Sequence, residues 1–205
     1  MNMPKIFNMV SGIVLTILLI VSCGGSSSNA GQAVLDAISA RTSIRAYQDR
    51  PVGADTVELL LRAAMSAPSA RNRQPWAFIV VDDKDLLRQL ADSLPYAQSA
   101  AAAPMAVVVC GVLTESQGAT NAGWWVQDAA AASENLLLAA HAVGLGAVWT
   151  GVYSYEDRVR AVRNVLGLPR HVVPLNVIPI GYPAENPAPK QKWDPAKVRR
   201  NGWPE

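Results

Sequence analysis

Two arginines flank a Thr-Ser pair in the segment RTSIRAY, residues 41–47. The guanidinium group of arginine offers a planar fork of donors to phosphate, and hydroxyl groups add short hydrogen bonds. Arg41, Thr42 and Ser43 therefore form a candidate anion site, and Arg45 adds a second cation. Taken alone, the segment is equally compatible with a solvated loop that carries two arginines.

A second polar stretch, APSARNRQPWAF, covers residues 67–78 and joins an amphipathic segment to an apolar one. Pro68 stiffens the backbone, and Ser69 lies next to it. The amides of Asn72 and Gln74 each carry donors and acceptors, which suit the edge of a heteroaromatic ring. A plain turn would tolerate the same composition.

A third stretch, GLGAVWTG at residues 144–151, is rich in small residues, which let the backbone approach a flat ligand closely. Elsewhere, His141 and His171 have no Cys or His neighbour at ligand spacing, so we expect no metal site. Cys110 lies in an apolar run and is expected to be a buried thiol. No side chain stands out as a dedicated acid, base or nucleophile, so the predicted set of catalytic residues is empty.

Hydrophobic periodicity predicts interleaved helices and short strands. Residues 56–65 repeat apolar positions with a helical period, and residues about 122–143 form a long apolar helix capped by Gly144. Without an even βαβ rhythm, a G-x-G-x-x-G or a P-loop motif, the dinucleotide-fold and P-loop classes are excluded. The further expected elements are helices over 33–40, near 86–90 and from 154 to about 167, and strands over 76–81, 105–111, 146–151 and 172–181.

Four motifs occur in an order and spacing that resemble the nitroreductase family: R-x-S-x-R, APSxxNxQPW, GLGxxW and GYPAExPxPKxK. The resemblance covers residues 33–205, the expected FMN-binding domain. It implies an α+β fold, a nitroreductase-like α/β/α sandwich with a central mixed, mainly antiparallel sheet and an extended C-terminal tail. It also implies an intertwined homodimer with two flavin sites at the subunit interface.

The resemblance assigns roles to the residues that match the motifs. Arg41, Thr42 and Ser43 would hold the FMN phosphate together with Lys190 and Lys192, although lysines of an irregular tail are also compatible with simple solvation. Arg45 would lie near the pyrimidine edge of the flavin, where a cation favours the reduced state. The remaining roles are a loop supplied by a second subunit (Pro68, Ser69, Asn72, Gln74), backbone at the flavin N5 side (Thr150, Gly151), and aromatic rings that either stack on a flat substrate or pack an interface (Trp124, Trp125).

The implied function is an FMN-dependent oxidoreductase. It would pass hydride through flavin N5 from a donor, NAD(P)H in relatives, to a nitroaromatic, a quinone or a similar flat acceptor. Three alternatives stay open at this stage: reductive dehalogenation, flavin fragmentation, and a non-catalytic flavin-binding lipoprotein. The nearly balanced net charge of +2 gives no sign of a nucleic-acid partner.

The N-terminus indicates export. Residues 1–22 combine one lysine with an apolar run too short to span a bilayer, as in a secretory signal peptide. The junction before Cys23 resembles a bacterial lipoprotein signal, which implies lipidation of Cys23, a flexible Gly/Ser tether over 23–32, and a lipid-anchored protein of the cell envelope. An ordinary cleaved signal or an anchor helix is the alternative. Nucleotide donors are scarce outside the inner membrane, and without a twin-arginine pair FMN would be acquired after export.

Overall fold

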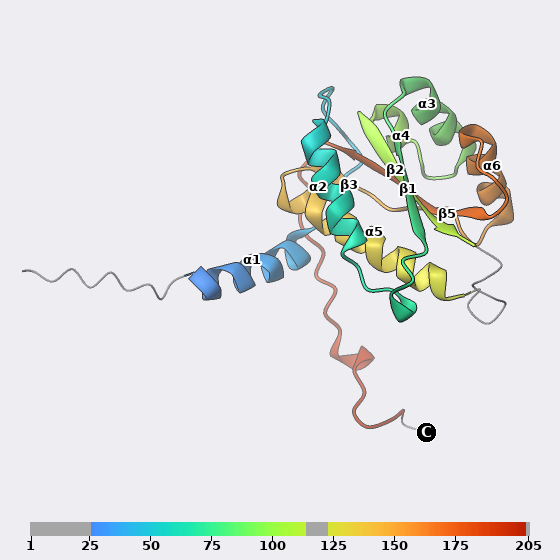
Figure 1. The fold of residues 1–205 in the computed structure, drawn as a ribbon. Helices are drawn as coiled ribbons and strands as arrows, with labels where there is room; N and C mark the ends of the chain where they lie inside the picture. The colour runs from blue at the N-terminus through green and yellow to red at the C-terminus, as the bar shows by residue number, and fades with distance from the viewer. Residues whose placement is uncertain (1–25, 114–122, 204–205) are drawn as a thin grey trace, which may run out of the picture.

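The computed structural model describes residues 26–113 and 123–203 and is built around one sheet (Figure 1). Its strands are β1 (Trp76–Val81), β2 (Met105–Val112), β3 (Gly146–Ala147), β4 (Thr150–Gly151) and β5 (Val172–Gly181). They follow the order β1-β2-β5-β3, with β4 also paired to β5. Each pairing between these strands is antiparallel, and the one parallel contact in the described ranges is an isolated bridge between Ser43 and Ala147. The expected antiparallel sheet is therefore confirmed, and its expected mixed character reduces to that bridge.

Strand β2 shows why the sheet is covered on both faces. It is apolar and buried almost throughout, so it has no polar side to turn towards water. Because successive side chains point to opposite faces, Met105, Val107 and Val109 enter one core cluster, while Ala106, Val108 and Cys110 enter a second. Two cores on opposite faces of one sheet produce three layers.

Helices supply the two outer layers (Figure 1). Helices α2 (Ala54–Met65) and α5 (Trp124–Ala142) pack together against the first face. Helices α3 (Lys84–Ser93) and α6 (Glu156–Leu166) cover the second face, and the short helix α4 (Ser99–Ala102) packs beside α3. None of the helices within the described ranges is both long enough and apolar enough to cross a bilayer.

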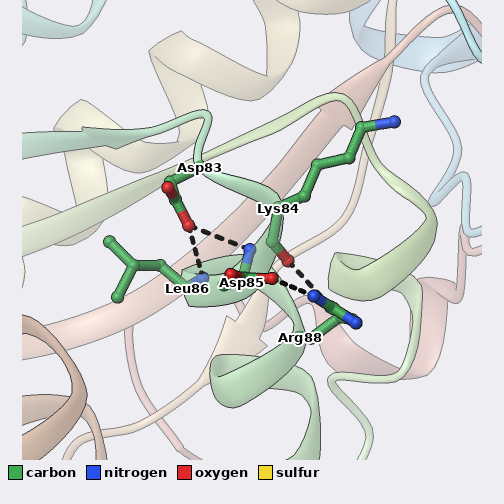
Figure 2. Close-up of polar contacts among 5 residues, drawn as sticks. All are labelled: Asp83, Lys84, Asp85, Leu86 and Arg88. Atoms are coloured by element: carbon green, nitrogen blue, oxygen red, sulfur yellow. Dashed lines mark hydrogen bonds and ion pairs between the residues drawn. The ribbon is translucent and has the colours of Figure 1, made fainter.

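The start of α3 shows how local sequence fixes a helix boundary. Asp83 is the N-cap residue, and its carboxylate accepts hydrogen bonds from the backbone N–H groups of Asp85 and Leu86, each at 2.9 Å (Figure 2). One turn further on, the Arg88 guanidinium forms an ion pair with Asp85. The cap satisfies donors that the first helical turn would otherwise leave without a partner.

The end of α5 depends on a glycine. Gly144 has a φ of +77°, in the left-handed region, and its N–H donates to the carbonyl of His141 at 3.0 Å. The chain therefore turns at once into Leu145 and β3. This agrees with the predicted cap.

Strand β5 carries two prolines in a central position, which is unusual because each removes a ladder donor. Pro174 pairs with Cys110 at the point where the register of β2 and β5 shifts, between Val109 and Cys110. Pro179 lies opposite Ala106. The register shift accommodates Pro174, which has no backbone N–H to donate to β2. Strand β5 therefore covers the predicted residues 172–181 without a break.

Helix α1 (Ser26–Ala40) begins earlier than expected. Residues 26–32 are helical and do not form the irregular tether that their Gly/Ser content indicated, because the low helix propensity of single Gly and Ser residues is outweighed when a longer helix propagates through them. Beyond the start of that helix, the Gln32 side chain donates to Asp36 at 2.8 Å, one turn along. The expected signal peptide and Cys23 lie outside the described residues. The helix projects from the body of the domain (Figure 1).

A backbone clamp ties the N-terminal segment 44–48 to the C-terminal segment 182–185. The N–H of Gln48 donates to the carbonyl of Tyr182 at 2.8 Å, and the N–H of Ala184 donates to the carbonyl of Ala46 at 2.9 Å. The partly buried Tyr47 hydroxyl donates to the carbonyl of Ile44 at 2.6 Å, and this burial raises the pKa of Tyr47 above the usual value. The clamp fixes where the tail leaves the sheet.

Candidate functional site

A cavity of about 640 Å³ lies between the end of α1 and the C-terminal tail. Its walls come from two segments that are far apart in the sequence but joined by the clamp described above. The first segment contributes Arg41, Thr42, Ser43 and Arg45, and the tail contributes Lys190 and Lys192. The structure thus gathers in one cavity the six residues that the sequence assigned to the phosphate and to the pyrimidine edge. The rest of the lining is Ile38, Ser39, Glu185, Pro187, Ala188 and Gln191.

The cavity is strongly basic. Four cationic side chains line it, and Glu185 is the one acid among its described lining residues. That carboxylate is engaged with the backbone, because Oε1 accepts from the N–H groups of Arg45 and Ala46, the latter at 3.1 Å. These hydrogen bonds, the one from Arg45 first, hold the pKa of Glu185 below its usual range. The surplus of positive charge favours an anionic ligand such as a phosphate ester.

Residues 43 and 44 are held in place by the backbone of β3. Ser43 forms the parallel bridge with Ala147, and the N–H of Ile44 donates to the carbonyl of Ala147 at 3.1 Å. This close approach requires Gly146, because a Cβ there would lie 2.6 Å from Ile44 Cβ. Gly146 of the GLGAVWTG stretch therefore permits a tight contact with Ile44, next to the cavity residue Ser43.

Arg41 has an anchor that the sequence did not reveal. Its Nε lies 3.2 Å from Oε1 of Glu134, an ion pair between the residue that follows α1 and the middle of α5. The Arg41 side chain is 17 % exposed and that of Glu134 is 49 % exposed. Glu134 and Glu185 were both missed as site residues. For Glu185 a signal was present, since it is the one acid between the start of the motif GYPAExPxPKxK and its lysines.

A second group of predicted site residues does not line this cavity. It lies in the loop around the single-turn helix η1 (Ala70–Asn72) and consists of Pro68, Ser69, Asn72 and Gln74. Asn72 and Gln74 have φ values of 53° and 49°, and Gln74 Nε2 donates to Asn72 Oδ1 at 2.9 Å. Ser69 Oγ accepts from the N–H of Gln74 at 2.9 Å. Left-handed non-glycine residues cost free energy and persist where their surroundings impose them. Here the loop is held by the buried Asp128 of α5, whose carboxylate accepts a hydrogen bond from the backbone N–H of Ala70 at 2.9 Å.

Thr150 and Gly151 form β4 and do not line the cavity, within the part of the chain that the structure describes. Thr150 is buried and lies opposite Val177, and the carbonyl of Gly151 accepts from Arg158 Nη1 at 3.2 Å. These contacts define a rigid backbone at the sheet edge. The predicted role at flavin N5 stays a prediction.

The two tryptophans that begin α5 differ sharply. Trp124 is 51 % exposed, whereas Trp125 is 3 % exposed. The Trp125 ring covers the backbone of Gly111, where a Cβ would lie only 2.2 Å from Cε3, and it meets Tyr153 edge-on with centroids 4.8 Å apart. Core packing therefore occupies the Trp125 ring in this chain, and its role as a platform for substrate stays a prediction. Trp124 remains available.

Comparison with known proteins places the chain in a family. The model of the nitroreductase family matches residues 38–125 and 93–182. A protein of Methanothermobacter thermautotrophicus predicted to be an NADH dehydrogenase/NAD(P)H nitroreductase is 47 % identical over 83 % of this chain and 87 % of its own. A crystal structure of a protein of the same predicted class from Parabacteroides distasonis is 46 % identical and superposes with a TM-score of 0.78, covering 83 % of this chain and 98 % of that one.

A third relative was crystallised with its cofactor. It is a predicted nitroreductase from Desulfovibrio desulfuricans in complex with FMN, 31 % identical, with a TM-score of 0.70 over 83 % of this chain and 98 % of that chain. The α+β fold, the antiparallel sheet and these matches together define the class of protein to which the chain belongs. The chain belongs to the nitroreductase family and is an oxidoreductase of that family.

Proposed function

We propose that this protein is an FMN-dependent oxidoreductase that takes reducing equivalents from NAD(P)H and passes them to a flat acceptor such as a nitroaromatic or a quinone. The cavity that joins residues 41–45 to residues 190–192 carries the proposal, because its cations and hydroxyls suit the phosphate of FMN. The FMN-bound relative and the predicted NAD(P)H nitroreductase add support.

The chain's own part in this activity is binding and orientation. Arg41, Ser43, Lys190 and Lys192 would hold the phosphate, and Arg45 would place a positive charge towards the ring. FMN, when bound, supplies the hydride chemistry that the side chains lack. The backbone clamp matters because it fixes the start of the tail whose lysines line the same cavity as Arg41.

Flavin titration tests the phosphate site. A charge-assisted hydrogen bond contributes about 1.5–3 kcal/mol, so Arg41→Ala should weaken FMN binding roughly ten- to a hundredfold. Lys192→Ala should cost less, because lysine acts as a point charge and not as a two-pronged donor. Riboflavin, which has no phosphate, is the matched ligand and should respond little. Equal loss for both flavins would show that Arg41 supports the fold and not the phosphate.

Anaerobic reduction tests the activity itself. The FMN-loaded protein should bleach with NADH or NADPH and recover its absorbance when a nitroaromatic or quinone is added. A flavin that is reduced by dithionite but by neither nucleotide would refute NAD(P)H as the donor. A panel of other reductants in the same assay then identifies the donor class.

We further propose that the complete flavin site needs two chains in a homodimer. Val34, Leu35 and Ile38 on α1 are more than half exposed, as are Trp193 and Trp203 of the tail. In addition, the predicted flavin residues fall into separate groups on one chain, with residues 68–74 and 150–151 outside the cavity. Sedimentation of the flavin-loaded protein should give a dimer, and a stable flavin-loaded monomer would contradict this.

We also propose lipid anchoring at Cys23, on the signal-like residues 1–22 and the small residues that follow. Expressed at full length in a bacterial host, the protein should fractionate with membranes and carry the mass of a diacylglyceryl group. Cys23→Ala should abolish both properties. If the variant keeps the membrane association and the mass of the wild type, the lipid anchor is refuted.

A further inference from the structure

The ion pair between Arg41 and Glu134 has a geometry that suits a positioning device. Glu134 belongs to α5, the central helix of the first core, where its neighbours Ser133, Leu136 and Leu137 are buried. Arg41 follows α1 directly, and its backbone N–H donates to the carbonyl of Ala37 at 3.0 Å. The contact therefore joins a side chain at the end of a projecting helix to the best-buried helix of the domain.

The ion pair joins Glu134 to the inner nitrogen of the Arg41 guanidinium group. Glu134 meets Arg41 at Nε, 3.2 Å away. Arg41 lines the cavity, whereas Glu134 does not belong to its described lining. A guanidinium group held at Nε retains its two Nη groups, the prongs that bind a phosphate through parallel hydrogen bonds.

We propose that Glu134 is a positioning residue for the phosphate of the flavin: it orients Arg41 from behind so that the two Nη groups are already aimed into the cavity. This inference rests on the proposed function. Arginine has a long side chain with many rotamers, and fixing it before binding removes part of the entropy that a ligand must otherwise overcome. The negative charge of Glu134 opposes this benefit, since it lies near the site of an anionic phosphate.

Two substitutions separate orientation from charge. Glu134→Gln keeps an oxygen acceptor at the same position and removes the negative charge. Glu134→Ala removes both. Because ordering one rotamer-rich side chain costs binding affinity, Glu134→Ala should bind FMN roughly two- to tenfold more weakly than Glu134→Gln. Glu134→Gln should bind FMN at least as tightly as the wild type.

The measurement is fluorescence titration of apo protein with FMN and with riboflavin, at fixed salt. If Glu134 orients Arg41 towards the phosphate, the ratio of FMN affinity to riboflavin affinity falls in Glu134→Ala and is preserved in Glu134→Gln. Glu58→Ala, which removes the exposed ion pair with Arg62 on α2, is the matched control and should leave both affinities unchanged. Melting curves of each apo variant check folding, and Glu134→Ser takes the place of the alanine variant if the latter does not fold.

The outcomes are decisive. Equal FMN affinity in Glu134→Ala and Glu134→Gln, or a parallel loss of FMN and riboflavin in Glu134→Ala, overturns the positioning role while the proposed function stands. A wild-type protein that binds FMN no better than riboflavin refutes the phosphate site itself, and the positioning role falls with it. A selective loss of FMN in Glu134→Ala that is rescued in Glu134→Gln supports the proposal.

Discussion

The carboxylate of Glu185 accepts a hydrogen bond from the backbone N–H of Arg45, across 140 positions of sequence. This contact, reinforced by the N–H of Ala46, joins the tail to the basic wall of the cavity. It forms with the ionised carboxylate, which is why the pKa of Glu185 lies below its ordinary value of 4.5.

The pH dependence of stability tests this contact. A carboxyl group whose pKa is lower in the folded state stabilises the fold above its unfolded pKa, and the contribution is lost as the pH falls through the folded value. Wild type should therefore melt at a higher temperature than Glu185→Gln at pH 7. The gap should narrow below pH 4.5, because protonated glutamic acid and glutamine are alike in charge. A gap that stays constant down to pH 3 would contradict the assignment.

Trp124 and Trp125 form a matched pair of adjacent residues with opposite environments. Trp125→Ala should lower the free energy of unfolding by about 3–5 kcal/mol, since it leaves a hole against Gly111. Trp124→Ala should change it by about 0.5 kcal/mol or less. Urea denaturation of both variants decides the matter. A comparable loss in the two variants would show that Trp124 is also packed, for example in an interface between chains.

The same pair shows how far the sequence alone can go. Two adjacent tryptophans at a predicted helix start were recognisable, but adjacent helical residues point about 100° apart, and which one enters the core depends on how the helix packs. Apolar runs, in contrast, defined strands well. β1 and β5 have their predicted bounds, and β2 is one residue longer.

The close contact of Gly146 with Ile44 predicts a coupling. Gly146→Ala would place a Cβ 2.6 Å from Ile44 and should cost about 1–3 kcal/mol of stability, with weaker FMN binding because Ser43 is displaced. Ile44→Gly removes the clashing Cβ, Cγ1 and Cγ2 atoms. The double variant should therefore lose less than the two single losses added together, as measured by urea denaturation of all three. Additive losses would show that the two residues do not meet.

Cys110 should be chemically inert in the native state. It is buried in the second core cluster, and burial raises the pKa of its thiol to about 12. At pH 8 almost no thiolate exists, so a thiol reagent should modify Cys110 only as fast as the protein unfolds. Cys110→Ser is the control that reports any reaction at Cys23. Rapid native-state labelling that disappears in this control would contradict the burial of Cys110.

Local sequence patterns could not identify Glu134, the residue that we propose to orient Arg41. The residues that we propose to bind phosphate form a recognisable motif, because a ligand of fixed chemistry demands particular side chains in a short segment. Glu134 lies in the middle of the long helix α5, and the sequence holds no sign that its partner is Arg41. Long-range contacts of this kind depend on the arrangement of α1 and α5. Composition alone also could not show that residues 26–32 of the predicted tether over 23–32 belong to helix α1.

The clamp between residues 44–48 and 182–185 has a consequence for biosynthesis. The buried residues of both core clusters precede position 182, so the core of the sheet and its helices is specified without the tail. The cavity is not, since it needs Lys190 and Lys192. The proposed loading with an anionic ligand therefore needs the tail, and a polypeptide that stops shortly after Gly181 lacks half of the cavity lining.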